Sequence, residues 1–175
     1  MSKSHLKKYL KELTKEQLEV QMIELYEKFS SVKVYYNFVF NPNEDKLLQE
    51  YKIKVSNEYF PIQTGKTKRR AKMRRSVAQK LIKHFILLGV DPYIIADAMC
   101  YHIEIAQAFS AEHIVKQELF FKSMLYSFEQ TVRFLIANGI LEDFKSRITA
   151  ISLQSSTQRW NNKQGFTSIV ENFEY

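Results

Sequence analysis

Apolar side chains recur every three or four positions along most of this 175-residue chain, which is the spacing of one face of an α-helix. Alternation at every second position, the strand pattern, is scarce, and only four glycines and three prolines interrupt the chain. The pattern predicts an all-α protein of seven to eight helices. We expect them to pack as an irregular antiparallel helical bundle or as a short stack of helical hairpins.

Capping residues mark where the predicted helices begin and end. The TKEQ motif at residues 14–17 is a capping box ahead of the second helix. Gly89 is a natural left-handed end for the fifth helix, and Asp91 followed by Pro92 is an N-cap with an N1 proline for the sixth. Ser110 is expected to cap a long seventh helix. The predicted helices cover residues 4–13, 14–29, 32–40, 43–60, a fifth ending at 88, 92–109, 110–138 and 141–152.

The predicted domain organisation is one helical domain over residues 1–152 and a polar C-terminal tail over residues 153–175. Residues 153–165 have little apolar periodicity, so we expect them to be loose, while the following FTSIVENF either docks or stays free. Near the other end, the aromatic run at residues 35–40, YYNFVF, has no basic residue within it. This run is therefore expected to lie in the core and not to form a base-stacking platform.

Positive charge is concentrated in one part of the chain. Residues 59–90 carry nine Lys or Arg and no acid, whereas the rest of the chain carries 17 basic and 19 acidic residues. The formal net charge of +7 is therefore local. A segment of this kind attracts phosphate backbones, acidic proteins or anionic membrane surfaces.

The basic segment, a predicted loop and helix over residues 62–88, includes the stretch GKTKRRAKMRRS at residues 65–76. If it is helical, one stripe is apolar: Met73, Val77, Leu81, Phe85 and Leu88. The opposite, free face then carries Arg69, Lys72, Arg75, Lys80 and Lys83. We expect residues 64–74 to form a mobile approach to this helix. The full set of predicted anion-binding or nucleic-acid-binding residues is Lys66, Lys68, Arg69, Arg70, Lys72, Arg74, Arg75, Lys80 and Lys83.

The cysteine content and the hydropathy of the chain predict its cellular compartment. The single cysteine, Cys100, excludes an intrachain disulfide framework and is expected to be a small buried hydrophobe. The first residues lack the apolar region of a secretory signal, and the longest apolar runs are far shorter than the ~20 residues of a membrane span. We therefore expect a cytoplasmic protein without a transmembrane segment.

Three stretches resemble a family of short bacterial helical proteins known only as a domain of unknown function. They are SHLKKYLKELTKEQLEVQMIELYEKF at residues 4–29, YYNFVFNPNEDKLL at residues 35–48 and RRSVAQKLIKHFILLGVDPYIIADAM at residues 74–99. The resemblance spans most of residues 1–140. It implies a self-standing bacterial helical domain, and it transfers no activity and no site residues.

Two motifs in the chain fail as nucleotide-binding or DNA-reading signals. GKT at residues 65–67 ends like a phosphate-binding loop, but Phe60 occupies the position of the glycine that such a loop requires. LGVDPYIIADAM at residues 88–99 is spaced like a helix-turn-helix, yet no Lys, Arg or Asn lies between Asp91 and Lys116 to read base edges. We interpret it as an ordinary helical hairpin.

Catalytic and metal-binding patterns are absent from the sequence. The four histidines have no metal-ligand spacing, and we predict no metal and no cofactor. His102 falls in an apolar series and is expected to be a core histidine. An enzyme would need an unrecognised site that joins His84, His102, His113, Glu104 and Glu112 in one cleft.

Three hypotheses on function remain open from the sequence. The first is a non-enzymatic helical module that binds nucleic acid non-specifically through the basic segment. The second is a protein-interaction module that recognises an acidic partner. The third is the enzyme with the His/Glu site. The sequence does not predict the oligomeric state.

Overall fold

A computed structural model describes residues 2–63 and 69–172, and within these residues every regular element is a helix. The helices are α1 (Lys3–Lys11), α2 (Lys15–Lys28), α3 (Ser30–Phe40), α4 (Glu44–Tyr59), α5 (Arg75–Leu88), α6 (Pro92–Glu112), α7 (Glu118–Ala137), α8 (Leu141–Thr157) and α9 (Lys163–Glu171). The all-α class is confirmed, with nine helices in the described residues where seven to eight were predicted. Contacts divide the chain into two compact units, Met1–Asn43 and Glu44–Tyr175.

The N-terminal unit consists of α1, α2 and α3, and none of its described residues is buried. The predicted capping box is present, because the Thr14 hydroxyl accepts from the backbone N–H of Gln17 and the Gln17 side chain accepts from that of Thr14. The expectation that the aromatic run at residues 35–40 lies in a core is wrong. Phe40 is 74% exposed and Tyr35 is 43% exposed, because this short unit builds no core of its own.

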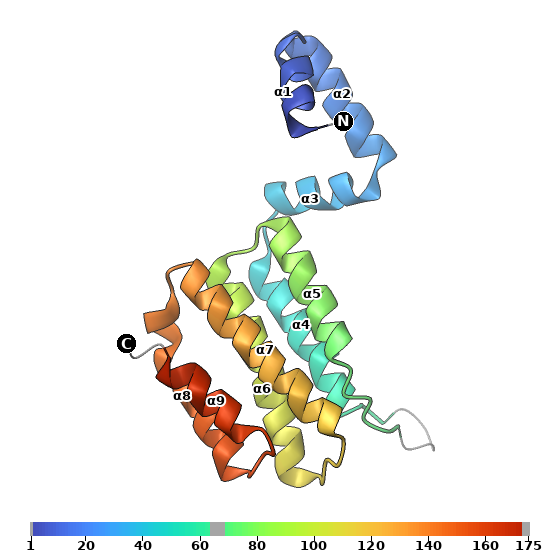
Figure 1. The fold of residues 1–175 in the computed structure, drawn as a ribbon. Helices are drawn as coiled ribbons and strands as arrows, with labels where there is room; N and C mark the ends of the chain where they lie inside the picture. Colours follow the sequence, from blue (N-terminus) through green and yellow to red (C-terminus); the bar gives the residue numbers. More distant parts are fainter. Residues whose placement is uncertain (1, 64–68, 173–175) are drawn as a thin grey trace. The chain divides into compact units, whose positions relative to one another are not determined.

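The C-terminal unit is built around α6, which packs against α4, α5, α7 and α8 (Figure 1). Since α6 has neighbours on several sides, its apolar residues are not confined to one stripe, and Cys100 and Ile103 are fully buried. Outside this core, a half-buried ion cluster joins three helices: Arg147 on α8 pairs with Asp97 and Glu104 on α6, and Lys52 on α4 also pairs with Asp97.

The predicted start of α6 is confirmed, whereas the predicted start of α7 is wrong. Gly89 ends α5 with a φ of 75°, and the Asp91 carboxylate accepts from the backbone N–H of Tyr93 at 2.7 Å, both as predicted. Ser110 does not cap the next helix. It lies inside α6, where its hydroxyl donates to the Gln107 carbonyl at 3.1 Å, and α7 begins only at Glu118.

The C-terminal segment is ordered, contrary to the expected loose region over residues 153–165. Helix α8 continues to Thr157, and a further helix, α9, packs against α7 and α8. Trp160 is 3% exposed and Phe166 is fully buried. These two aromatic side chains fix a segment whose remaining residues are mostly polar. The boundary predicted after residue 152 therefore falls inside a helix.

Candidate anion-binding groove

The residues before α5 are folded onto the end of α4. The backbone N–H groups of Lys72 and Met73 both donate to the Glu58 carbonyl, at 2.9 and 3.0 Å. This carbonyl lies in the last turn of α4, where no helical partner is available. Met73 has a positive φ of 49°, so the chain is not helical here. Residues 69–74 are therefore not helical, so the helical placement of this stretch is wrong.

Arg74 is paired and does not project freely past the helix. Its guanidinium donates twice to the Glu58 carboxylate, at 2.8 and 2.7 Å, and Glu58 is only 9% exposed. These bonds hold the pKa of Glu58 below its usual value and keep the carboxylate charged. Arg74 thus neutralises the charge of a nearly buried carboxylate. Its own positive charge is balanced within the protein.

Arg75 is likewise held by the protein, through α7. Its Nε donates to the Ser127 hydroxyl at 2.7 Å and its Nη2 donates to the Gln130 carbonyl oxygen at 2.6 Å, while its guanidinium lies 4.7 Å from the ring centroid of Tyr126. Partial burial lowers the pKa of Arg75. The predicted free position of Arg75 is wrong, yet the bonds use only two of its five N–H donors.

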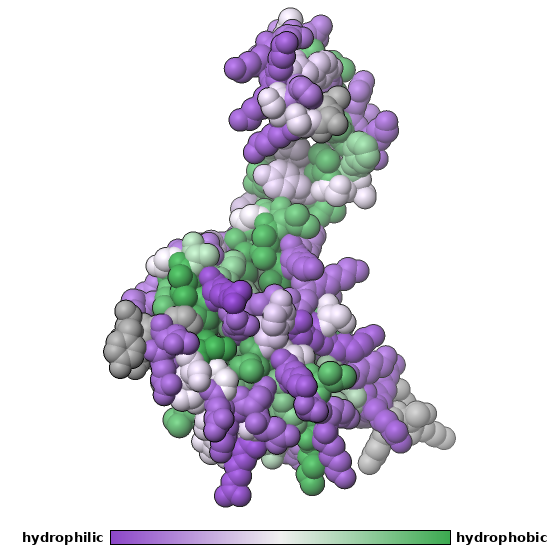
Figure 2. All heavy atoms as spheres, viewed as in Figure 1, coloured by the Kyte–Doolittle hydropathy of each residue, from purple (hydrophilic) through white to green (hydrophobic). Residues whose placement is uncertain are grey.

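An open groove of about 900 Å³ runs between α5 and α7, beside the fixed Arg75. Exposed Lys80, Lys83 and His84 line it from α5, and half-exposed Tyr126 lines it from α7. We call this the basic groove. Its described lining residues include no acid, and they are Arg75, Ser76, Gln79, Lys80, Leu81, Lys83, His84, Leu87, Tyr126 and Gln130. Figure 2 shows hydrophilic and apolar side chains mixed over the face that α5 and α7 form.

The apolar stripe of α5 is displaced from its predicted position. The buried side chains are Ala78, Ile82, Phe85 and Leu88, whereas Val77 and Leu81 are only half-buried. The prediction assumed one helix continuing from residue 69, whereas α5 starts at Arg75 and meets α6 and α4 along its own 3.6-residue period. Lys80 and Lys83 still lie on the exposed side.

The nine predicted anion-binding residues therefore fall into four settings. Lys80, Lys83 and Arg75 line the basic groove. Arg69, Arg70 and Lys72 are exposed on the segment before α5, and Arg74 is paired with Glu58. Lys66 and Lys68 lie outside the described residues. The sequence did not predict the contributions of α7, where polar Ser127 and Gln130 recur at helical spacing beside Ser123 and Thr131.

We expect Arg75→Ala to lower the free energy of unfolding by about 1–3 kcal/mol, because the nearly buried Ser127 hydroxyl loses its donor and the Tyr126 ring loses its cation. Chemical denaturation measures this change. Lys80→Ala, an exposed position on the same helix, is the control and should change stability by less than about 0.5 kcal/mol. Equal effects of the two substitutions would contradict the fixed position of Arg75.

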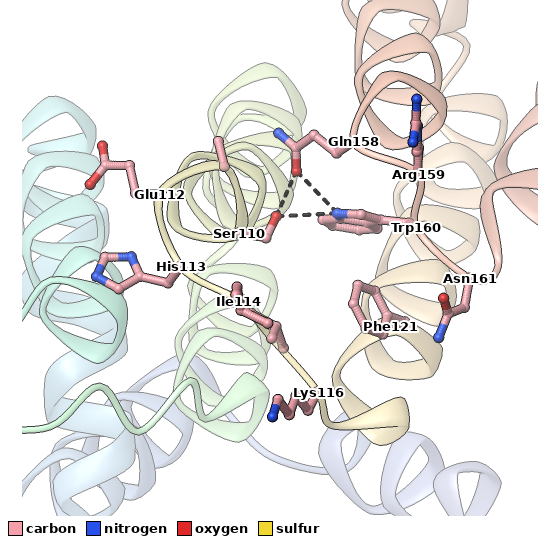
Figure 3. A pocket seen from close by; sticks show the side chains of 12 residues that line it. Ser110, Glu112, His113, Ile114, Lys116, Phe121, Gln158, Arg159, Trp160 and Asn161 are labelled. Atoms are coloured by element: carbon pink, nitrogen blue, oxygen red, sulfur yellow. Dashed lines mark hydrogen bonds between the residues drawn. The ribbon is translucent and has the colours of Figure 1, made fainter.

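A second hollow of about 510 Å³ lies where the α6–α7 and α8–α9 connections meet (Figure 3). In Figure 3, Ser110, Gln158 and Trp160 point toward one another, and the indole N–H donates to both the Ser110 hydroxyl and the Gln158 carbonyl oxygen, at 3.2 and 3.0 Å. Their polar atoms thus satisfy each other. We interpret this cluster as a structural contact that holds the C-terminal segment against the end of α6.

The histidines and acids of the enzyme hypothesis are distributed over separate environments. His84 lines the basic groove, while His113 stacks on Phe109 at 4.3 Å between ring centroids and shares the second hollow with Glu112. Glu104 is paired with Arg147.

Two further side chains with reactive groups, Cys100 and His102, are both buried in the core. His102 is buried, its Nε2 lies 3.3 Å from the Tyr59 hydroxyl, and burial lowers its pKa to about 3. Burial raises the pKa of the Cys100 thiol to about 12, which disfavours a reactive thiolate. Together with the scattered His and Glu residues, these two groups do not assemble into one cleft.

The part of the chain that the structure describes contains neither a metal-binding cluster nor a membrane-spanning helix. There, no three His, Cys, Asp or Glu side chains are grouped so that they could hold a metal ion. In the same residues, no helix combines the length and the apolar character needed to cross a membrane.

Comparison with known proteins identifies a family but no activity. The model of the "Family of unknown function (DUF6155)" matches residues 1–174. The chain therefore belongs to this family, which confirms the resemblance noted above and extends it beyond residue 140. No curated protein and no solved structure matches the chain. The bacterial origin that the resemblance implies stays a prediction.

Proposed function

We propose that this member of DUF6155 is a non-enzymatic helical binding module that takes the phosphate backbone of a nucleic acid, without sequence preference, along the basic groove. One observation carries the proposal: a groove of about 900 Å³ is lined by three cationic side chains and His84, with no acid among its described lining residues. Lys80 and Lys83 supply charge to it, and Arg75 supplies a guanidinium that the protein already holds in position.

The cations of the groove continue onto the neighbouring segment. Arg69, Arg70 and Lys72 are exposed on the segment directly before α5, and with the three cations of the groove they make six positive charges. Such a row follows phosphates spaced along a strand better than it encloses a single small anion. The half-exposed ring of Tyr126 adds an aromatic surface, which single-stranded nucleic acids use for stacking.

A second candidate function is recognition of an acidic protein segment in the same groove. Leu87 lines the groove and is 76% exposed, and Leu81 is half-buried beside it. An amphipathic acidic helix would place apolar side chains on these leucines and carboxylates on the lysines.

For either partner we propose that the protein is cytoplasmic, in keeping with the single cysteine of the chain, which is buried and unpaired.

The salt dependence of binding tests the nucleic-acid proposal. If about five charges neutralise phosphates, log K should fall with log salt at a slope near −4 to −5, so that affinity drops roughly 300- to 1,000-fold between about 50 and 200 mM salt. Fluorescence anisotropy with labelled DNA and RNA oligonucleotides measures the slope.

The double variant Lys80→Gln/Lys83→Gln should flatten that slope by about two units, because it removes two phosphate contacts. Lys145→Gln/Lys163→Gln removes the same charge from exposed positions on α8 and α9 and is the matched control. An unchanged slope in the groove variant would place the contact elsewhere. Failure to bind either nucleic acid at about 50 mM salt would favour the acidic partner.

A further inference from the structure

The N-terminal unit exposes an unusual amount of apolar surface. None of its described residues, 2–43, is buried, and Figure 2 shows apolar side chains open to solvent on this unit. Thirteen of its large apolar side chains are exposed: Leu6, Tyr9, Leu10, Leu18, Val20, Met22, Ile23, Leu25, Phe29, Val34, Tyr35, Val39 and Phe40. Clusters of this kind on a protein surface mark interaction sites.

The length of this unit points to the same conclusion. It spans Met1–Asn43, and chains of about 40 residues rarely bury enough surface to be stable without a disulfide, a metal or oligomerisation. Its helices are linked by exposed hydrogen bonds such as Tyr26 to Asn37 at 3.1 Å and Gln21 to Tyr9 at 2.5 Å, and by the Lys33 ammonium 5.7 Å from the Tyr26 ring centroid. An additional apolar partner is therefore needed to stabilise the three helices.

Helix α2 carries apolar residues on two sides. Met22 and Tyr26 face α3, with which they form hydrogen bonds through Tyr36 and Asn37. At about 100° per residue, Val20 and Ile23 project roughly 110° away from that side. They are 56% and 59% exposed, so α3 does not cover them. This second side is the part of α2 that lacks a neighbour.

The charges of α1 and α2 complement each other. Helix α1 carries four lysines and no acid, and α2 carries four glutamates and two lysines. On a helical projection Glu16 and Glu27 lie on the side of Val20 and Ile23, and Glu19 and Glu24 lie at its two edges. Helix α1 combines an apolar stripe, which includes Leu6 and Leu10, with adjacent lysines. One unit therefore contains both halves of a complementary contact.

We propose that the N-terminal unit is the contact surface of a homodimer, in which α1 of one copy lies against the Val20/Ile23 side of α2 in the other. A two-fold axis forms this contact twice, because each copy supplies both a basic α1 and an acidic α2. The rest of the chain, residues 44–175, carries 19 basic and 14 acidic residues, so its net charge has the same sign as that of α1. The complementary surface is therefore a second copy of this unit.

Sedimentation equilibrium of the full chain tests the proposal directly. We expect a mass of about twice 20.8 kDa, with a dissociation constant of about 10 μM or tighter. Salt should weaken the dimer, since part of the contact is electrostatic. A chain that remains monomeric at concentrations up to about 100 μM would overturn the proposal.

Substitution of Val20 and Ile23 tests whether their side of α2 forms the dimer contact. Val20→Lys/Ile23→Lys should weaken dimerisation at least about tenfold. Leu153→Lys is the control, because this leucine is 67% exposed on α8 and should leave the dimer unchanged. A dimer of undiminished affinity in the double variant would overturn the proposal.

A charge exchange keeps the proposal testable even if the apolar variant misfolds. Lys3→Glu/Lys7→Glu/Lys11→Glu leaves α1 with three glutamates and one lysine, and Glu24→Lys/Glu27→Lys leaves α2 with four lysines and two glutamates, so each variant alone should dimerise poorly. An equimolar mixture should recover a heterodimer, because both contacts then join opposite charges. Absence of recovery would overturn the two-fold arrangement. The basic groove plays no part in these measurements, so the proposed function stands or falls separately.

Discussion

A chain that stops after Ser152 is expected to melt more than about 15 °C below the full chain, or not to fold. The truncation removes Trp160 and Phe166, which are 3% and 0% exposed. Loss of a buried Trp or Phe side chain costs about 3–5 kcal/mol each, a large share of the 5–15 kcal/mol that stabilises a typical domain. The Phe128 ring, whose centroid lies 4.9 Å from that of Phe166, would also lose its cover.

Thermal unfolding followed by circular dichroism measures this loss, and the emission of Trp160, the only tryptophan, reports on the same region in the full chain. We expect blue-shifted emission, since the indole is buried against Phe120 and Phe121. Lys163→Ala, an exposed position in α9, is the control and should barely change the melt. A truncated chain that melts within a few degrees of the full chain would show that this segment is dispensable.

The C-terminal segment shows where local pattern stops predicting structure. Periodicity located most helices, and caps such as Gly89 and Asp91 gave the ends of α5 and the start of α6, because these signals are local. Trp160 and Phe166 are separated by a turn and do not form a stripe. Their burial depends on side chains of α7 about 40 positions earlier, so no local window contains the reason.

The basic segment illustrates the same limit for the candidate site. Its charge is evident in the sequence, but the partners of Arg74 and Arg75 are not. Glu58 lies 16 positions before Arg74, and Gln130 lies 55 positions after Arg75, each on a different helix. A charge run therefore predicts that an anion-binding surface exists, whereas the packing of α4 and α7 decides which cations remain available to a ligand.

Stability is expected to fall by about 1.6 kcal/mol between pH 6.5 and pH 5, because of His102. This imidazole is fully buried, and its pKa is lowered from 6.5 to about 3 because burial disfavours the charged form, with a smaller effect from the cationic Arg75. Well above pH 6.5 the side chain is neutral in both the folded and the unfolded chain, so it has no effect on stability. Below pH 6.5 only the unfolded chain takes up the proton, which favours unfolding by about 1.4 kcal/mol per pH unit.

Urea denaturation at several pH values checks this prediction, with His102→Gln as the test variant. Glutamine has no titration in this range and retains a polar group toward the Tyr59 hydroxyl, so the variant should lose most of the slope between pH 6.5 and 5 whatever its absolute stability. His84→Gln makes the same exchange at an exposed histidine and should retain the slope. The carboxylates of Glu58 and Asp97, whose pKa values are lowered by their cationic partners, lose their stabilising effect only at more acidic pH. Equal slopes in the unsubstituted protein and the His102→Gln variant would mean that His102 becomes protonated without unfolding, and that its environment is more open to water than the buried contact with Tyr59 indicates.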